Sequence, residues 1–153
     1  MHTKPPIIAG SRIGIDTAPF IYLIEQNPAY YARVRAFFQL LDSGTIHGYT
    51  SIITLIEVLT IPRNNQPPHL ATAYRAILSN SPALTLIPTD IIIAERAAQL
   101  RVDFQLRTPD AIQVATALHN RCAAFFTNDK RLRRVSAIPI VILDECTEDD
   151  FDI

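Results

Sequence analysis

The chain has 153 residues, a length that fits a single domain, and its 48% hydrophobic and 19% charged residues suit a globular protein. Its formal net charge of −1 excludes the overall basic field that marks many nucleic-acid-binding proteins. No stretch approaches the roughly 20 apolar residues that a membrane span needs, and the N-terminus lacks the apolar core of a signal peptide, so we expect a soluble protein.

The first half of the sequence predicts strands that are each followed by helices. Paired prolines and a Gly-Ser step discourage regular structure in residues 1–11, which we interpret as an N-terminal extension. Pro19 suits the first turn of a helix, where a missing N–H costs little. The expected elements are a strand at 12–15, a helix at 17–25, a helix at 29–41, a strand at 46–50 and a helix through 59 that Ser51 caps.

The second half continues the alternation. Thr108 is expected as the N-cap of a helix, with Pro109 at its first position and Asp110 in its first turn. The other expected elements are a loop at 62–68, a helix at 69–79, a strand at 84–87, a helix capped by Thr89 or Asp90, and strands at 123–126 and 138–143.

Short apolar strands that alternate with helices favour an α/β fold whose parallel sheet is covered on both faces. In such sheets, ligands bind beyond the carboxyl ends of the strands. Asp16 and Asp129 directly follow strands, while Glu57 and Asp110 lie in the first or second turn of helices that start from the same edge. We therefore expect these four carboxylates to converge.

Each of the four acids also has a simpler explanation. Glu57 interrupts an apolar stripe that includes Ile53 and Ile56, where a carboxylate is costly unless it is paired or bound to metal. Alone, Asp16 could cap the next helix, Glu57 could pair with a distant arginine, Asp110 could favour a helix N-terminus, and Asp129 could cap a short turn. Jointly they predict one acidic pocket that holds a divalent cation.

The ligand types favour Mg²⁺ or Mn²⁺, as one or two ions, because hard cations prefer oxygen ligands. The four histidines form no pair at ligand spacing, and Cys122 and Cys146 follow no metal-binding pattern. We interpret these cysteines as reduced thiols of a cytoplasmic protein, with one disulfide as the alternative.

Such a cluster suits phosphodiester hydrolysis, because bound metal activates water and neutralises charge in the transition state. We expect Asp16 and Asp110 to be the principal ligands, and Asp129 to bind directly or through water. Glu57 completes a second site or acts as a base that orients the attacking water. The residues expected to hold the carboxylates or the water in place are Thr17, Thr127 and Asn128.

The order and context of the four acids resemble the PIN-domain family. The motifs are Gly14–Thr17, Thr54–Val58, Pro109–Ala117 and Phe126–Asp129, and the resemblance extends from Ile13 to Leu143. It implies a three-layer α/β/α sandwich with a mostly parallel sheet of four to five strands. We expect this domain to span residues 12–145 and an acidic C-terminal tail to span 146–153.

Because the chain is small and has no appended domain, it is most similar within this family to the VapC-type toxins of type II toxin–antitoxin modules. Ala18 and Pro19 depart from the usual pattern after the first acid, and the N-terminal extension is longer than the minimal toxin form. The resemblance implies a metal-dependent endoribonuclease that leaves a 5′-phosphate and a 3′-hydroxyl, a cognate antitoxin and a homodimer. The candidates for contacts with the RNA backbone, or for an ordinary solvated face, are Arg121, Lys130, Arg131, Arg133 and Arg134.

Two other functions compete with this hypothesis. A PIN-fold module could bind RNA or protein with little catalysis. A receiver-like phosphoacceptor domain also places acids around Mg²⁺, but it has paired acids after the first strand, where this chain has Asp16 alone. The apolar helices, which include Tyr30, Tyr31, Phe37 and Phe38, provide either partner surfaces or core residues.

Overall fold

The computed structural model describes residues 2–60 and 67–153, so the expected loop at 62–68 lies outside the described residues except for its last two positions. The strands are β1 (Arg12–Ile15), β2 (His47–Ser51), β3 (Leu84–Ile87), β4 (Ala124–Thr127) and β5 (Ile140–Ile142). The α-helices are α1 (Thr17–Ile24), α2 (Tyr31–Asp42), α3 (Ile52–Thr60), α4 (Pro68–Asn80), α5 (Ile91–Phe104) and α6 (Thr108–His119). The 3₁₀ helices are η1 (Lys130–Arg134), η2 (Leu143–Glu145) and η3 (Glu148–Phe151).

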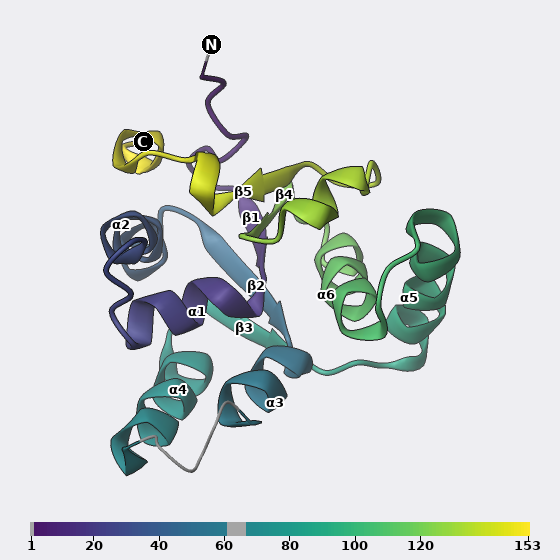
Figure 1. The fold of residues 1–153 in the computed structure, drawn as a ribbon, viewed down its shortest axis with the longest axis horizontal. Helices are drawn as coiled ribbons and strands as arrows, with labels where there is room; N and C mark the ends of the chain where they lie inside the picture. The colour runs from purple at the N-terminus through teal and green to yellow at the C-terminus, as the bar shows by residue number, and fades with distance from the viewer. Residues whose placement is uncertain (1, 61–66) are drawn as a thin grey trace.

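The described strands form one sheet in the order β3-β2-β1-β4-β5, and all four pairings are parallel (Figure 1). This confirms the predicted α/β fold with a parallel sheet. Because β1 is central, it ends between β2 and β4, which also end at the same edge. The residues that follow these three strands are therefore brought together.

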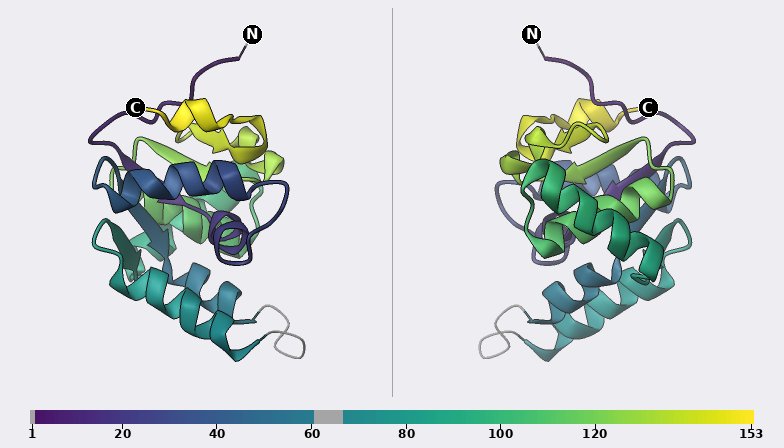
Figure 2. Two further views of the ribbon diagram at one scale, coloured as in Figure 1. Left: turned by 90° about the vertical axis from the view of Figure 1, so that its left-hand side faces the viewer. Right: turned by 90° about the vertical axis from the view of Figure 1, so that its right-hand side faces the viewer.

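Helices cover both faces of the sheet and produce the three predicted layers (Figure 2). Alternation along β1 assigns the faces: Ile13 and Ile15 belong to the apolar core beneath α2, while Gly14 faces α6. A Cβ atom at position 14 would lie 2.5 Å from Cβ of Ala117. The glycine therefore permits α6, which carries Asp110, to approach β1 closely.

Two local predictions differ from the structure by a residue or two, and a third is confirmed. Arg107, not Thr108, is the N-cap of α6, and Pro109 still lies within its first turn. The last strand is shorter than expected at 138–143, because Leu143 already begins η2. Asp90 caps α5 as predicted, its carboxylate accepting a hydrogen bond from the backbone N–H of Ile93 at 2.9 Å.

The apolar stripe expected around Glu57 is oriented differently from the prediction. Helix α3 buries Thr54 and Val58, whereas Ile56 is 56% exposed. In α2, Phe37 and Phe38 lie in the core, which resolves their two alternatives in favour of packing. No helix in the described ranges is both long and apolar enough to cross a membrane.

Candidate active site

Asp16 follows the central strand β1 and caps α1. One oxygen, Oδ1, accepts the backbone N–H of Thr17 at 2.8 Å, and the other, Oδ2, accepts the hydroxyl of Thr127 at 2.7 Å. Burial raises the pKa of Asp16 to about 6, although these two hydrogen bonds oppose the rise. The negative charges of Asp110 and Glu57 raise this pKa further, which places both acids near Asp16.

Glu57 reaches the same edge from the second turn of α3. Its Oε1 atom accepts a hydrogen bond from the hydroxyl of Thr17 at 2.7 Å. Within residues 2–60 and 67–153, no cation forms an ion pair with Glu57. A distant arginine from this part of the chain therefore does not account for its position.

Asp110 and Asp129 lie beside arginines instead. Arg107 Nε is 3.2 Å from Oδ2 of Asp110, and Arg131 Nη2 is 2.7 Å from Oδ2 of Asp129. Hydrogen bonds from Arg131 hold the pKa of Asp129 below its ordinary value. Asp129 also caps η1, as its simpler explanation required, and its backbone N–H donates to the hydroxyl of Thr127 at 3.0 Å. Thr127 thus connects Asp129 to the acid at the end of β1.

The donor atoms of this edge suit a hard divalent cation in type. They are carboxylate and hydroxyl oxygens, and the charges that raise the pKa of Asp16 are of the sign that a cation offsets. Among the residues that the structure describes, however, no group of three or more His, Cys, Asp or Glu side chains is drawn together into a metal-binding set. Two of the four acids, Asp110 and Asp129, are paired with arginines instead.

The other predicted residues divide between the acidic edge and elsewhere. Thr17 and Thr127 donate to the acids, whereas Asn128 holds a loop: its Oδ1 accepts the backbone N–H of Asp144 and its Nδ2 donates to Tyr22. Arg121 lies between α6 and the start of β4, at the opposite edge of the sheet.

The basic residues of η1 are mostly engaged with neighbours. Lys130 pairs with Asp144 at 2.9 Å, and Arg133 pairs with Glu145. Arg134 donates to the carbonyl of Gln105 at 2.8 Å. Among the predicted basic residues, Arg131 is therefore the one with a direct contact to a site acid.

Sequence reasoning missed the buried polar residues beneath the acids. Gln113 is 2% exposed and donates through Nε2 to Thr54 at 2.8 Å, while Thr50 lies 2.7 Å from the same hydroxyl. A signal was present, since Gln113 is a lone amide between the apolar residues Ile112 and Val114 of α6. Arg107, which pairs with Asp110, was also missed.

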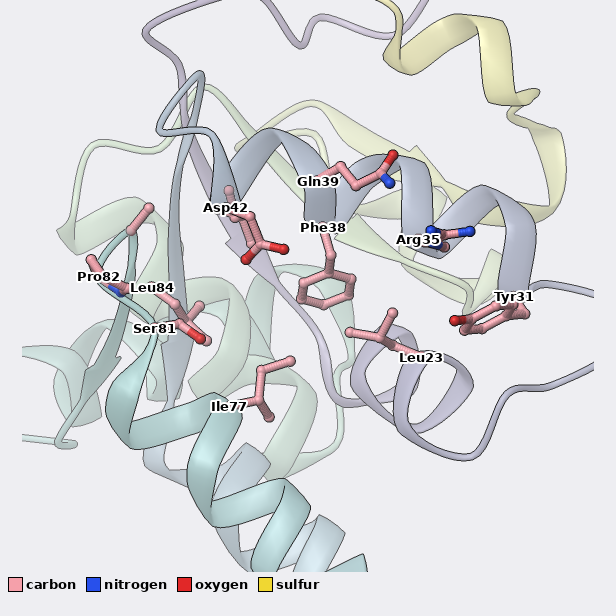
Figure 3. A pocket seen from close by; sticks show the side chains of 12 residues that line it. Leu23, Tyr31, Arg35, Phe38, Gln39, Asp42, Ile77, Ser81, Pro82 and Leu84 are labelled. Atoms are coloured by element: carbon pink, nitrogen blue, oxygen red, sulfur yellow. The ribbon is translucent and has the colours of Figure 1, made fainter.

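A cavity of about 320 Å³ lies apart from the acids, between α1, α2, α4 and the start of β3 (Figure 3). Leu23, Phe38 and Ile77 give it an apolar floor, and Arg35 and Asp42 lie at its polar rim. None of the four acids lines it. The cavity is a second surface feature and not part of the acidic edge.

The fold is similar to those of several solved toxin–antitoxin proteins. VapBC2 from Rickettsia felis, bound to a promoter DNA fragment, has a TM-score of 0.68 and 16% identity over 86% of this chain and 98% of that chain. A toxin–antitoxin complex from Klebsiella pneumoniae has a TM-score of 0.65 and 27% identity, covering 87% and 98%. VapC20 from Mycobacterium tuberculosis, described as a sarcin-ricin loop cleaving toxin, has a TM-score of 0.63 and 20% identity, covering 78% and 91%.

No curated protein sequence matches this chain. The profile of the PIN domain, in contrast, matches residues 13–138, which are most of the chain and include all four acids. This match and the similar structures contradict the receiver-like alternative. The chain belongs to the PIN domain family.

Proposed function

We propose that this protein is a metal-dependent endoribonuclease that hydrolyses RNA phosphodiester bonds, and that it is the toxin of a type II toxin–antitoxin pair. The observation that carries the proposal is Asp16: a carboxyl at the end of the central strand whose pKa is raised to about 6 by burial and by two neighbouring acids. A bound cation would favour the ionised form of such a buried carboxyl, because it offsets both the burial and the two like charges. Membership of the PIN domain family supports the assignment.

In this proposal, Asp16 and Asp110 are the principal ligands of Mg²⁺ or Mn²⁺, and Asp129 binds directly or through water. When bound, the metal lowers the pKa of a water molecule and neutralises charge on the phosphate. Glu57, held by the hydroxyl of Thr17, completes a second site or orients the attacking water. Thr127 holds Asp16 in place through its 2.7 Å hydrogen bond.

RNA is proposed as the substrate on the basis of the family, and VapC20, of similar fold, is described as a sarcin-ricin loop cleaving toxin. Arg131 is the basic residue nearest to the acids in the η1 segment, and 63% of its side chain is exposed. In this proposal, Arg131 contacts a phosphate beside the reacting one. The proposed nuclease domain spans residues 12–145, followed by the acidic tail at 146–153.

A cognate antitoxin and a second copy of the chain are the proposed partners, in the cytoplasm. Proteins of similar fold were crystallised as toxin–antitoxin complexes, some of them bound to DNA. Exposed apolar residues offer contact area at the start of α5, where Ile91 is 77% and Ile92 is 62% exposed. The cavity of Figure 3 is a further candidate surface for a protein partner.

The test is cleavage of labelled structured RNAs, including transfer RNAs, by the purified protein with Mg²⁺ or Mn²⁺ and with EDTA. Asp16→Asn and Asp110→Asn are tested beside the wild type. We expect cleavage that requires metal and is lost in both variants. Equal cleavage by all three proteins would reveal contamination. RNA binding without cleavage would favour the alternative of a binding module.

A further inference from the structure

A network of buried polar side chains lies directly beneath Glu57 and connects α6 to α3 and α1. Its centre is Gln113, which is 2% exposed. The Nε2 atom of Gln113 donates to the hydroxyl of Thr54 at 2.8 Å and to that of Thr17 at 3.3 Å. Its Oε1 atom accepts the backbone N–H of Ser51 at 3.4 Å. Because a backbone N–H can only donate, this contact fixes which end of the amide faces the threonines.

The direction of every hydrogen bond in the network follows from its fixed ends. Thr50 donates to the carbonyl of Ile15 at 2.7 Å, and a carbonyl can only accept. Since the one hydroxyl proton of Thr50 is used in that hydrogen bond, Thr54 is the donor in the 2.7 Å contact between the two threonines. Thr54 then has no proton left for Thr17, which lies 3.4 Å away. The hydroxyl of Thr17 in turn donates its hydrogen bond to the carboxylate of Glu57 at 2.7 Å.

We propose that Gln113 is a positioning residue that directs the hydroxyl of Thr17 toward Glu57 and thereby fixes that carboxylate at the metal site, a role that rests on the proposed function. The amide of Gln113 donates hydrogen bonds to the hydroxyl oxygens of Thr54 and Thr17. The hydroxyl of Thr17 therefore accepts a hydrogen bond from this amide and donates one to the carboxylate of Glu57. The other carboxylate oxygen of Glu57, Oε2, accepts no hydrogen bond from the described residues. That oxygen remains available for a cation or a water molecule.

The position of Gln113 distinguishes it from a residue that only stabilises the fold. Thr116, one turn further along α6, is as deeply buried, but its hydroxyl donates to the carbonyl of Ile112 in its own helix. Both ends of the Gln113 amide instead form hydrogen bonds with other helices and strands. One of its partners, Thr17, donates to Glu57. Groups that orient metal ligands through hydrogen bonds typically contribute about 10–100-fold to metal affinity.

The test is a double-mutant cycle on Mn²⁺ affinity, measured by electron paramagnetic resonance of free Mn²⁺. Gln113→Met removes the donor and keeps the side chain's length, and it is made in the wild type and in Glu57→Gln. We expect it to weaken Mn²⁺ binding about tenfold in the wild type and to have no effect without the carboxylate of Glu57. Thr17→Val should reproduce the loss, Thr17→Ser should retain affinity, and Thr116→Val should be silent.

Thermal unfolding verifies that each variant is folded. If Gln113→Met does not fold, Gln113→Glu replaces it: the added acid would tighten cation binding through charge alone, so weaker binding supports the role of the amide protons. If Gln113→Met weakens Mn²⁺ binding equally in the wild type and in Glu57→Gln, or weakens it in neither, the role of Gln113 is overturned. Mn²⁺ binding by the wild type would then still support the proposed nuclease. A wild type that binds no Mn²⁺ overturns the proposed function and this role with it.

Discussion

The four acids form two pairs that are held by different kinds of donor. Asp16 and Glu57, the inner pair, accept hydrogen bonds from threonine hydroxyls and a backbone N–H. Asp110 and Asp129, the outer pair, accept from arginines. The pKa values respond in opposite directions: burial raises that of Asp16 to about 6, whereas the contact with Arg131 lowers that of Asp129.

The difference indicates where the site lacks positive charge. Neutral donors orient the inner carboxylates but leave their charge uncompensated, and the nearby charge of Asp110 adds to the deficit at Asp16. Each outer carboxylate already has a guanidinium beside it. We therefore expect a divalent cation to relieve the repulsion at Asp16 most strongly, and Asp110 and Asp129 to exchange an arginine for the cation or for water.

The largest effect should come from removing an inner charge. Asp16→Asn keeps the shape of the cap but removes the proposed principal ligand, so metal-dependent RNA cleavage should fall by at least about 100-fold. Asp103→Asn is the matched control, because Asp103 accepts a hydrogen bond from Gln99 on the exposed surface of α5. Initial rates with a labelled RNA measure both. Comparable rates in the wild type and Asp16→Asn would refute the role of the inner pair.

A second change separates the two pairs in space. Gly14→Ala places a methyl group 2.5 Å from Cβ of Ala117 and 3.1 Å from Cδ1 of Phe125, so α6 with Asp110 must move away from β1. Overpacking of this kind costs about 1–3 kcal/mol of unfolding free energy. Urea unfolding measures the loss. Adding Ala117→Gly should recover part of it, and the absence of any recovery would show that the helix does not rest on this contact.

The metal-free protein should reveal the inner pair through pH. The raised pKa of Asp16 means that the folded state holds a proton between about pH 4 and 6 that the unfolded state has lost. The free energy of unfolding should therefore fall as pH rises through this range, by on the order of 2 kcal/mol. The lowered pKa of Asp129 acts in the opposite sense: its stabilisation is lost as pH falls below about 4.

Urea unfolding in EDTA at several pH values measures this dependence. Asp16→Asn removes the titrating group, so its stability should vary less between pH 4 and 6 and should exceed that of the wild type at pH 7. A decline in the variant as steep as in the wild type would assign the dependence to another group.

The smallest effect should come from the arginine beside Asp129 in the outer pair. Arg131→Gln removes a cation beside Asp129, so Mn²⁺ affinity should stay equal or rise a few-fold, while the salt dependence of RNA binding should lose about one unit of slope. Arg121→Gln is the control, because Arg121 lies at the opposite edge of the sheet. RNA binding by the two variants and the wild type is measured from 50 to 200 mM salt, and the slopes are compared. Equal slopes for the two variants would place the RNA elsewhere.

The sequence was sufficient to predict the order of strands and helices, because their periodicity is a local property. It also predicted at which edge of the sheet the acids lie, because parallel strands all end at the same edge. Asp90 and Asp16 were both recognisable as helix caps from their positions. The burial of α3 was harder to predict: an apolar stripe indicated Ile56 as a core residue, whereas the helix buries Thr54 because a polar network exists to receive it.

The division of the acids into two pairs could not be predicted, since it depends on contacts between distant elements. The contact of Thr17 with Glu57 joins residues 40 positions apart, and that of Thr127 with Asp16 joins residues 111 apart. The pairing of Asp129 with Arg131 is local, but only the folded η1 segment shows that the guanidinium lies against the carboxylate.

The most direct test of the inner pair is thermal unfolding of the wild type and Asp16→Asn, each in EDTA and in excess Mn²⁺. At pH 7 the variant should be the more stable protein in EDTA, and Mn²⁺ should stabilise only the wild type, by about 2.7 kcal/mol when the metal is at 100 times its Kd. The two proteins should therefore exchange their order of stability when metal is added. Equal stabilisation of both by Mn²⁺, or a wild type that is the more stable in EDTA, would contradict this prediction.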